Sequence, residues 1–187
     1  MLFAAALAAA LSGGPSVVAL ARCNNLNATH YEDQVRDYEK HPPTGATDRD
    51  ARFAALEGVI ASADNEMIIL QGICSPADFQ PVAAQLDAVD AWALVLESDL
   101  SRQKNATECP AAEVPIAQGY VANAWLLLSR ADLDATGKYP TVQNVLPKVQ
   151  TRAAALKLTL PARYDATNYW VTTVRNAGTE AAKGCPK

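Results

Sequence analysis

The stretch FAALEGVIASADNEMIILQGIC, residues 53–74, decides the fold class of this chain. Its apolar side chains recur at alternating steps of three and four residues, which places them on one face of an α-helix: Phe53, Leu56, Ile60, Ala63, Met67, Leu70 and Cys74. Thr47, followed by Asp48 and Asp50, resembles the capping signal that begins a helix. Such a one-sided helix is not stable alone in water, so the stretch predicts a helix packed against others.

Four further segments carry the same spacing and predict long helices. These helices are expected to follow Pro76, Pro110 or Pro115, Pro140 and Pro161. Their apolar stripes extend over residues 82–100, 116–131, 142–160 and 170–181. The polar residues 101–107 are expected to end the second helix, and residues 29–40 predict a short polar helix. Because strand-like alternation is absent and the connections are short, we predict an all-α, up-and-down bundle of four to five long helices.

The first 21 residues have the pattern of a secretory signal peptide. An apolar run over residues 2–11 is broken by SGGP at 12–15, and an A-x-A cleavage site ends at Ala21. No Lys or Arg precedes the run, and an uncleaved membrane anchor is the alternative, since a spanning helix needs about 20 apolar residues. We predict cleavage after Ala21, which leaves residues 22–187 as a single secreted or periplasmic domain.

The charge balance argues against two classes of partner. The chain has a formal net charge of -4, and its Lys and Arg residues form no basic stripe. Nucleic-acid binding needs such a stripe to neutralise phosphates, and anionic membrane surfaces also attract clustered basic residues. We therefore expect no nucleic-acid partner, and no stable membrane insertion once the signal peptide is removed.

Four dispersed cysteines predict two disulfides. Cys23, Cys74, Cys109 and Cys185 form no C-x-x-C pair, so a zinc site is a poor interpretation. In an exported chain an even set of cysteines indicates disulfide pairing. The alternative is four reduced, buried thiols in a cytosolic protein. We predict a bundle that is stapled by disulfides.

The predicted topology favours one pairing of the cysteines. A disulfide needs Cα atoms within about 7 Å of each other. If every helix reverses direction, Cys74 and Cys185 lie at one end of the bundle and Cys109 lies at the other. We therefore predict Cys74–Cys185 and Cys23–Cys109. The alternative is Cys23–Cys74 with Cys109–Cys185.

One half-motif resembles a metal site. Asp132, Asp134 and Thr136, followed by Gly137, match the start of a calcium-binding loop. The twelfth position is Gln143, which cannot supply the bidentate carboxylate that the motif requires. We interpret the segment as a helix end, with Gly137 as its cap, and we expect neither a metal nor another cofactor.

No catalytic constellation stands out. His30 and His41 are interpreted as surface residues and Met67 as a core residue, because no haem-attachment motif accompanies them. There is no G-x-S-x-G motif, and the cysteines are assigned to disulfides. Four acids are interpreted as ordinary polar-face residues: Asp87, Asp90, Glu97 and Asp99. We therefore expect no catalytic residue and a protein that is not an enzyme.

Two other sets of residues are candidate sites. Asn27 and Asn105 each begin an N-x-T tripeptide in a predicted loop, so both are glycosylation acceptors if the source is eukaryotic. Five aromatic residues could line a ligand pocket between helices if they converge, and core packing is the alternative: Trp92, Tyr120, Trp125, Tyr169 and Trp170.

Two functional hypotheses follow from this sequence. The first is a non-enzymatic helical bundle outside the cytoplasm that binds a partner protein or contributes to an assembly. Exposed apolar faces on the outer helices would favour it. The second is a carrier of a small apolar ligand, such as a lipid or a pigment, held between helices. An unfilled space in the bundle would favour this one.

Overall fold

The computed structural model describes Cys23, residues 27–130 and residues 139–185. The predicted signal peptide and the calcium half-motif at Asp132, Asp134 and Thr136 lie outside the described residues. The described part of the chain forms six α-helices and one short 3-10 helix, without strands: α2 (Asn27–Lys40), α3 (Ala46–Ile73), α4 (Pro76–Glu108), α5 (Pro110–Arg130), α6 (Pro140–Ala155), η2 (Arg163–Asp165) and α7 (Asn168–Ala182). The all-α bundle prediction is confirmed.

The helix starts show how local chemistry sets the boundaries. Ser75 caps α4 by accepting a hydrogen bond from the backbone N–H of Asp78 at 3.3 Å, with Pro76 at the first helical position. The predicted cap at Thr47 is wrong, because α3 already begins at Ala46. Instead the carboxylate of Asp48 accepts from the backbone N–H of Thr44 at 2.9 Å. Asp48 therefore binds the segment that precedes α3 and fixes how that segment enters the helix.

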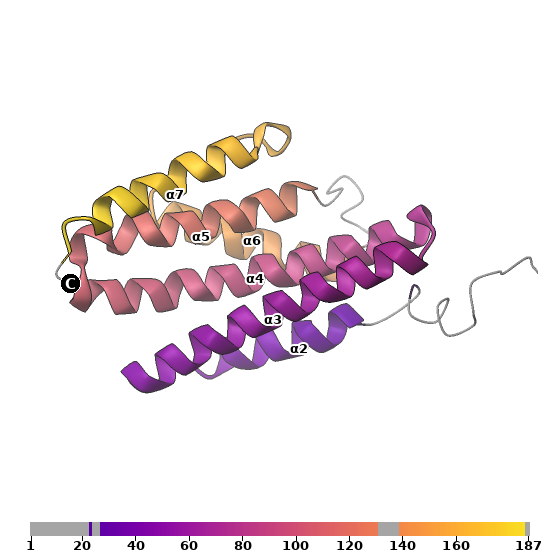
Figure 1. Ribbon diagram of the computed structural model, residues 1–187, viewed down its shortest axis with the longest axis horizontal. Coiled ribbons are helices and arrows are strands. Elements are labelled where there is room, and N and C mark those ends of the chain that lie inside the picture. Colours follow the sequence, from indigo (N-terminus) through magenta and orange to yellow (C-terminus); the bar gives the residue numbers. More distant parts are fainter. Residues whose placement is uncertain (1–22, 24–26, 131–138, 186–187) are drawn as a thin grey trace, which may run out of the picture.

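Helix α4 is the centre of the bundle. It packs against α2, α3, α5 and α6, while α7 packs against α5 on the far side (Figure 1). The expectation that residues 101–107 end this helix is wrong, since α4 continues to Glu108 and only Cys109 separates it from α5. The polar side chains there bond within the helix: Asn105 Nδ2 donates to the carbonyl oxygen of Ser101 at 2.9 Å.

The apolar faces of α2 to α6 meet in one large core around α4. Val89 and Leu128 are fully buried, as are the valines that line up along α6. Burial of this apolar surface is the main stabilising term, at about 25 cal/mol per Å². Helices α5 and α7 approach so closely that a Cβ on Gly178 would lie 3.1 Å from the Cα of Ile116 and from the carbonyl oxygen of Pro115. Glycine is therefore needed at this crossing.

The chain does not reverse direction between α6 and α7. Helix α6 ends at Ala155, five residues before the predicted end of its stripe, and Lys157 takes a left-handed conformation with φ 55°. The segment after α6 runs alongside α5, toward the C-terminal end of α5. Gln118 Nε2 donates to the carbonyl oxygen of Leu156 at 2.9 Å, and Trp125 Nε1 donates to that of Pro161 at 3.1 Å. Helix α7 therefore begins beside the end of α5 and runs antiparallel to it.

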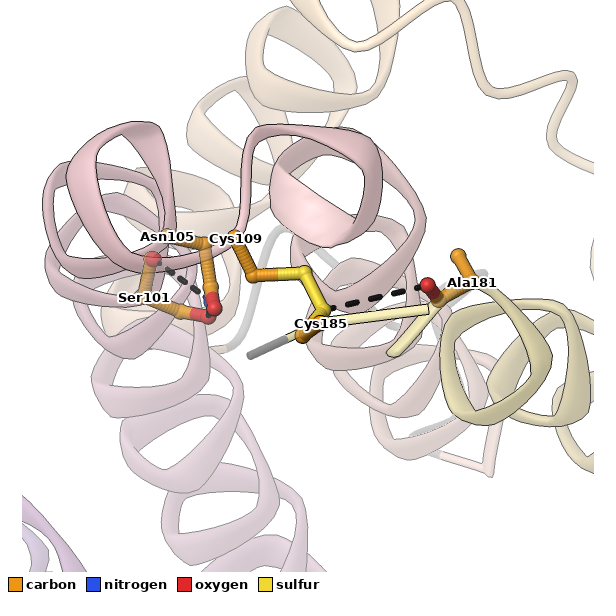
Figure 2. The surroundings of a disulfide bond; sticks show 5 residues. All are labelled: Ser101, Asn105, Cys109, Ala181 and Cys185. Atoms are coloured by element: carbon orange, nitrogen blue, oxygen red, sulfur yellow. Dashed lines mark hydrogen bonds between the residues drawn. A yellow bond between two sulfur atoms is a disulfide. The ribbon is translucent and has the colours of Figure 1, made fainter. Parts of the chain in front are cut away.

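This return segment decides the disulfide pairing. Cys23 is bonded to Cys74 with a Cα–Cα distance of 5.7 Å, and Cys109 to Cys185 with 5.4 Å. Figure 2 shows Cys185 meeting Cys109 at the start of α5. The predicted pairs Cys74–Cys185 and Cys23–Cys109 are wrong and the alternative pairing is present. The error came from assuming that every helix reverses direction. The two disulfides indicate that the chain folds in an oxidising environment.

Candidate ligand-binding groove

A groove with a volume of about 710 Å³ runs between α2, α4 and α6. The C-terminal end of α2, the Pro42-Pro43 corner and the first turns of α3 form one side, and α6 forms the other. This volume falls in the range of about 300–1,000 Å³ that is typical of small-molecule sites. The groove exists because α2 and α6 both pack on α4 without closing over its second half.

The floor of the groove is apolar. It consists of Leu56 from α3 and Val95, Leu96 and Leu100 from α4. Three of these side chains are also part of the buried core, and Leu96 is half-buried. The floor is thus the outer surface of the core itself, so its shape is fixed by packing. Apolar ligand surface placed here would be removed from water.

One wall carries a cation that is held by an acid and an aromatic ring. Lys148 Nζ on α6 lies 2.6 Å from Glu39 Oε1 at the end of α2 and 4.7 Å from the centre of the Trp92 ring. The indole Nε1 of Trp92 donates to the same Glu39 oxygen at 3.3 Å. Trp92 is only 3% exposed and does not line the groove. Trp92 supports Glu39 and Lys148, the two side chains that do line the groove.

A second ion pair lies one helical turn along α6. Arg152 Nη2 pairs with Asp99 Oδ2 across the groove. Burial raises the pKa of Asp99, and the nearby guanidinium groups of Arg152 and Arg102 oppose that rise. The Nε–H of Arg152 is shielded from solvent and has no hydrogen-bond partner among the described residues. Arg152 therefore keeps an unused donor, and an unsatisfied buried donor is costly.

The five aromatic residues of the predicted pocket do not converge. Trp92 and Trp125 belong to the core, and Trp170 packs partly buried against it. Tyr120 contacts Phe53, with ring centres 5.8 Å apart, whereas Tyr169 is 82% exposed. None of the five lines the groove described above. Trp92 and Trp125 pack in the core, which was the alternative interpretation of these residues.

The acids of α4 lie inward, against expectation. Asp90 is 1% exposed and Glu97 is 2% exposed, and each has one carboxyl oxygen without a hydrogen-bond partner among the described residues. Burial raises the pKa of Asp90 to about 9 and that of Glu97 to about 8, and neighbouring acids add to both shifts. Burial also raises the pKa of Asp87 to about 6. Their interpretation as ordinary polar-face residues is therefore wrong for Asp90 and Glu97, which are neutral near pH 7.

The remaining candidates have ordinary surroundings. His30 and His41 are exposed, and Met67 packs against the small core that contains Leu70 and Leu86. Within the described ranges no cluster of His, Cys, Asp or Glu could hold a metal ion, and no helix is long and apolar enough to cross a membrane. The glycosylation acceptors do not lie in loops, so that part of the prediction is wrong. Asn27 is the first residue of α2, and Asn105 lies in the last turn of α4.

Sequence reasoning missed the groove. Its polar wall follows a visible signal, because Asn144, Lys148 and Arg152 recur every four residues on one face of α6. Nothing in that spacing tells whether the face meets solvent or a hollow. Comparison of the chain with protein-family models, with curated proteins and with solved structures gives no match. Function is therefore inferred from the geometry of the site.

Proposed function

We propose that this protein is an exported, non-enzymatic binding protein that carries a small amphiphile in the groove between α2, α4 and α6. The ligand has an apolar body and an acidic head group. The observation that carries the proposal is a groove of about 710 Å³ with an apolar floor and basic side chains at its wall. This develops the second of the two sequence-based hypotheses.

Charge complementarity supports the acidic head group. Three basic side chains line the groove, Arg52, Lys148 and Arg152, against two acids, Glu39 and Asp99. A carboxylate or phosphate at the wall is attracted by the positive charges of Lys148 and Arg152, which both line the groove. The alkyl chain of the ligand lies along the leucine floor. Recognition of this kind needs no catalytic group, which agrees with the proposed non-enzymatic role.

Export through the N-terminal segment is part of the same proposal. Residues 2–21 have the apolar run and the A-x-A site of a secretory signal, and the two disulfides need an oxidising compartment. We propose that the mature chain acts in the periplasm or outside the cell. A carrier fits that setting, because amphiphiles need a protein to cross water between membranes.

A fluorescence titration with dansyl-labelled undecanoic acid tests the carrier function. Ala155 is exposed and lines the groove at the end of α6, so Ala155→Trp fills the groove without removing a core side chain. We expect at least about tenfold weaker binding, or about 1.4 kcal/mol. Ala154→Trp is the matched control, since Ala154 is exposed on the same turn and does not line the groove.

The acidic head group has its own test. The methyl ester of the same probe keeps the apolar body and loses the charge, so we expect it to bind several-fold more weakly. Equal affinity of acid and ester would refute the head-group assignment. Equal loss of binding in Ala155→Trp and Ala154→Trp, or no saturable binding to the wild-type protein, would refute the groove as the site.

A protein partner is the second candidate function. Three isoleucines on the outer face of α3 favour it, because Ile68 is 69% exposed, Ile69 is 44% exposed and Ile73 is 38% exposed. Neighbouring exposed apolar residues of this kind often mark an interaction surface. Sedimentation velocity over a range of concentrations tests self-assembly at this face. Assembly that is lost in Ile68→Ser would support it, and a monomer at all concentrations would count against assembly.

A further inference from the structure

One ion pair joins the floor of the groove between α2, α4 and α6 to its wall. Asp99 lies on the face of α4 that forms the floor, beside Leu96 and Leu100, and Arg152 lies on α6. Arg152 Nη2 donates to Asp99 Oδ2 across the groove. The side chain of Asp99 is 30% exposed and that of Arg152 is 23% exposed. Both side chains line the groove, so an acidic head group that binds Arg152 competes with Asp99 for it.

Asp99 depends on Arg152 more than the other acid of the groove depends on its own cation. Among the described residues, the carboxylate of Asp99 accepts a hydrogen bond from Arg152 alone. Glu39 instead has two donors, because Lys148 Nζ and Trp92 Nε1 both donate to its Oε1 atom. If a ligand takes the donor of Asp99, this carboxylate is left without a hydrogen bond, whereas Glu39 keeps one.

The surroundings of Asp99 already favour its neutral form. Burial raises the pKa of Asp99, and the charges of Arg152 and Arg102 oppose that rise. Arg102 is engaged elsewhere, since its Nη2 and Nε atoms donate to Glu113 Oε1 on α5 at 3.0 Å and 3.1 Å. The ionised form of Asp99 is therefore held mainly by its bond to Arg152.

Other charged and titratable groups line the groove from each helix around it. Arg52 of α3 pairs with Asp48 at 3.0 Å, and Asp48 does not line the groove. Lys148 of α6 pairs with Glu39 at the end of α2 at 2.6 Å, and Tyr38 lies beside Glu39. Apart from Arg152, each of the two cations in this set thus has an acid of its own.

Two titratable groups nearby do not line the groove. His41 follows α2, and its ring nitrogen Nδ1 lies 3.2 Å from Asp37 Oδ1. Glu97 precedes Asp99 by two residues on α4, and residues at that spacing lie on different faces of a helix. Asp99 is therefore the acid whose ionisation a ligand at Arg152 changes directly.

We propose that an acidic ligand enters this groove together with one proton: its head group takes over the guanidinium of Arg152, and Asp99 becomes protonated. The inference rests on the carrier function proposed above and adds how that site is regulated. Two anions at one guanidinium repel each other, and a nearby like charge disfavours the ionised form of a carboxyl group. The proton comes from solvent and binds a carboxyl oxygen of Asp99, so the net charge within the groove stays the same.

Proton uptake makes binding dependent on pH. The complex holds one proton more than the free protein and the free ligand together, so affinity rises as pH falls, by up to about tenfold per pH unit. The rise levels off at the low pH where Asp99 is protonated before the ligand arrives. A carrier of this kind loads its ligand in acidic surroundings and releases it where pH is higher.

Isothermal titration calorimetry with decanesulfonate tests the coupling at pH 5.5, 6.5 and 7.5, each in two buffers of different ionisation enthalpy. The sulfonate stays ionised over this range, so any proton that is taken up binds to the protein. We expect affinity to rise toward pH 5.5. We expect proton uptake that approaches one proton per ligand where affinity changes most steeply with pH.

Asp99→Asn has the shape of the protonated acid and cannot take up a proton at this position. We expect its affinity to be the same at all three pH values, without proton uptake, and at pH 7.5 several-fold higher than that of the wild type. Glu39→Gln is the matched control, because it removes one negative charge from the same groove and leaves Asp99 in place. Its proton uptake and its pH dependence should match the wild type.

The outcomes separate this inference from the carrier function. No saturable binding of decanesulfonate, or binding that Ala155→Trp leaves intact, would overturn the carrier function and this inference with it. Binding in the groove without proton uptake by the wild-type protein would overturn the coupling alone, and so would a pH dependence that Asp99→Asn retains. Circular dichroism at each pH shows whether each variant is folded, and the proton count of the wild-type protein needs no variant.

Discussion

Replacing Asp90 with asparagine should remove a large part of the pH dependence of stability. Asp90 is 1% exposed, and burial, followed by the charges of Asp64, Asp87 and Glu97, raises its pKa to about 9. In the unfolded chain an aspartate has a pKa of about 3.9. Between these two values the folded protein holds a proton that the unfolded chain has lost. The contribution is therefore fully present below about pH 4 and is lost as pH rises toward 9.

The size of the effect follows from that window. Each pH unit inside it costs about 1.4 kcal/mol of unfolding free energy for one such group. An asparagine side chain has no proton to lose in this range, so the stability of Asp90→Asn relative to the wild type rises by roughly 3 kcal/mol between pH 5 and pH 7. Glu97 has a similar window up to about pH 8, so the variant keeps a reduced slope.

Urea unfolding followed by circular dichroism at pH 5, 6 and 7, with the disulfides intact, measures this difference. Asp33→Asn is the control, because the side chain of Asp33 is 62% exposed on α2. Its stability curve should run parallel to the wild-type curve. If Asp90→Asn also runs parallel, then Asp90 is ionised in the folded protein, and burial does not hold its proton.

Two further predictions concern packing and cross-links. Gly178→Ala should destabilise the protein by about 1–3 kcal/mol, because its Cβ would meet the backbone of Ile116 at 3.1 Å. Gly58→Ala, where nothing lies within 4 Å, should stabilise it by about 0.5–1 kcal/mol; thermal unfolding ranks the two, and equal effects would refute the close approach of α5 and α7. Replacing Cys109 and Cys185 together with serine should cost about 2–4 kcal/mol in urea unfolding. Non-reducing peptide mapping should recover both bridges as described, and a peptide that joins Cys185 to any other cysteine would contradict the fold.

The spacing of apolar residues was enough to predict the fold class. The stripe from Phe53 to Cys74 became α3, with Leu56, Ala63 and Leu70 buried. The spacing was not enough to predict where helices end. Residues 101–107 are polar yet helical, because their side chains bond within the helix and α5 covers one side of it. Polarity reports exposure to water and does not by itself break a helix.

The disulfide pairing and the candidate sites depended on packing that a sequence does not display. The non-helical segment between α6 and α7 runs along α5, so Cys185 bonds to Cys109 and not to Cys74. Asp90 and Glu97 are acidic residues of the kind that usually face water. Helix α4 has neighbours on almost every side, so both positions are buried. The groove between α2, α4 and α6 arises from how far α2 and α6 extend over α4, and that length is set by tertiary contacts.

The two disulfides close covalent rings that do not overlap along the chain. One ring spans residues 23–74 and the other spans 109–185, so the whole of α4 lies outside both. A single cut anywhere in α4 would separate the molecule into two pieces under non-reducing conditions, whereas a cut inside either ring would leave it in one piece. The central helix is thus the sole covalent link between two independently closed halves. Its resistance to proteases therefore depends on its packing and its helical hydrogen bonds, because neither disulfide encloses it.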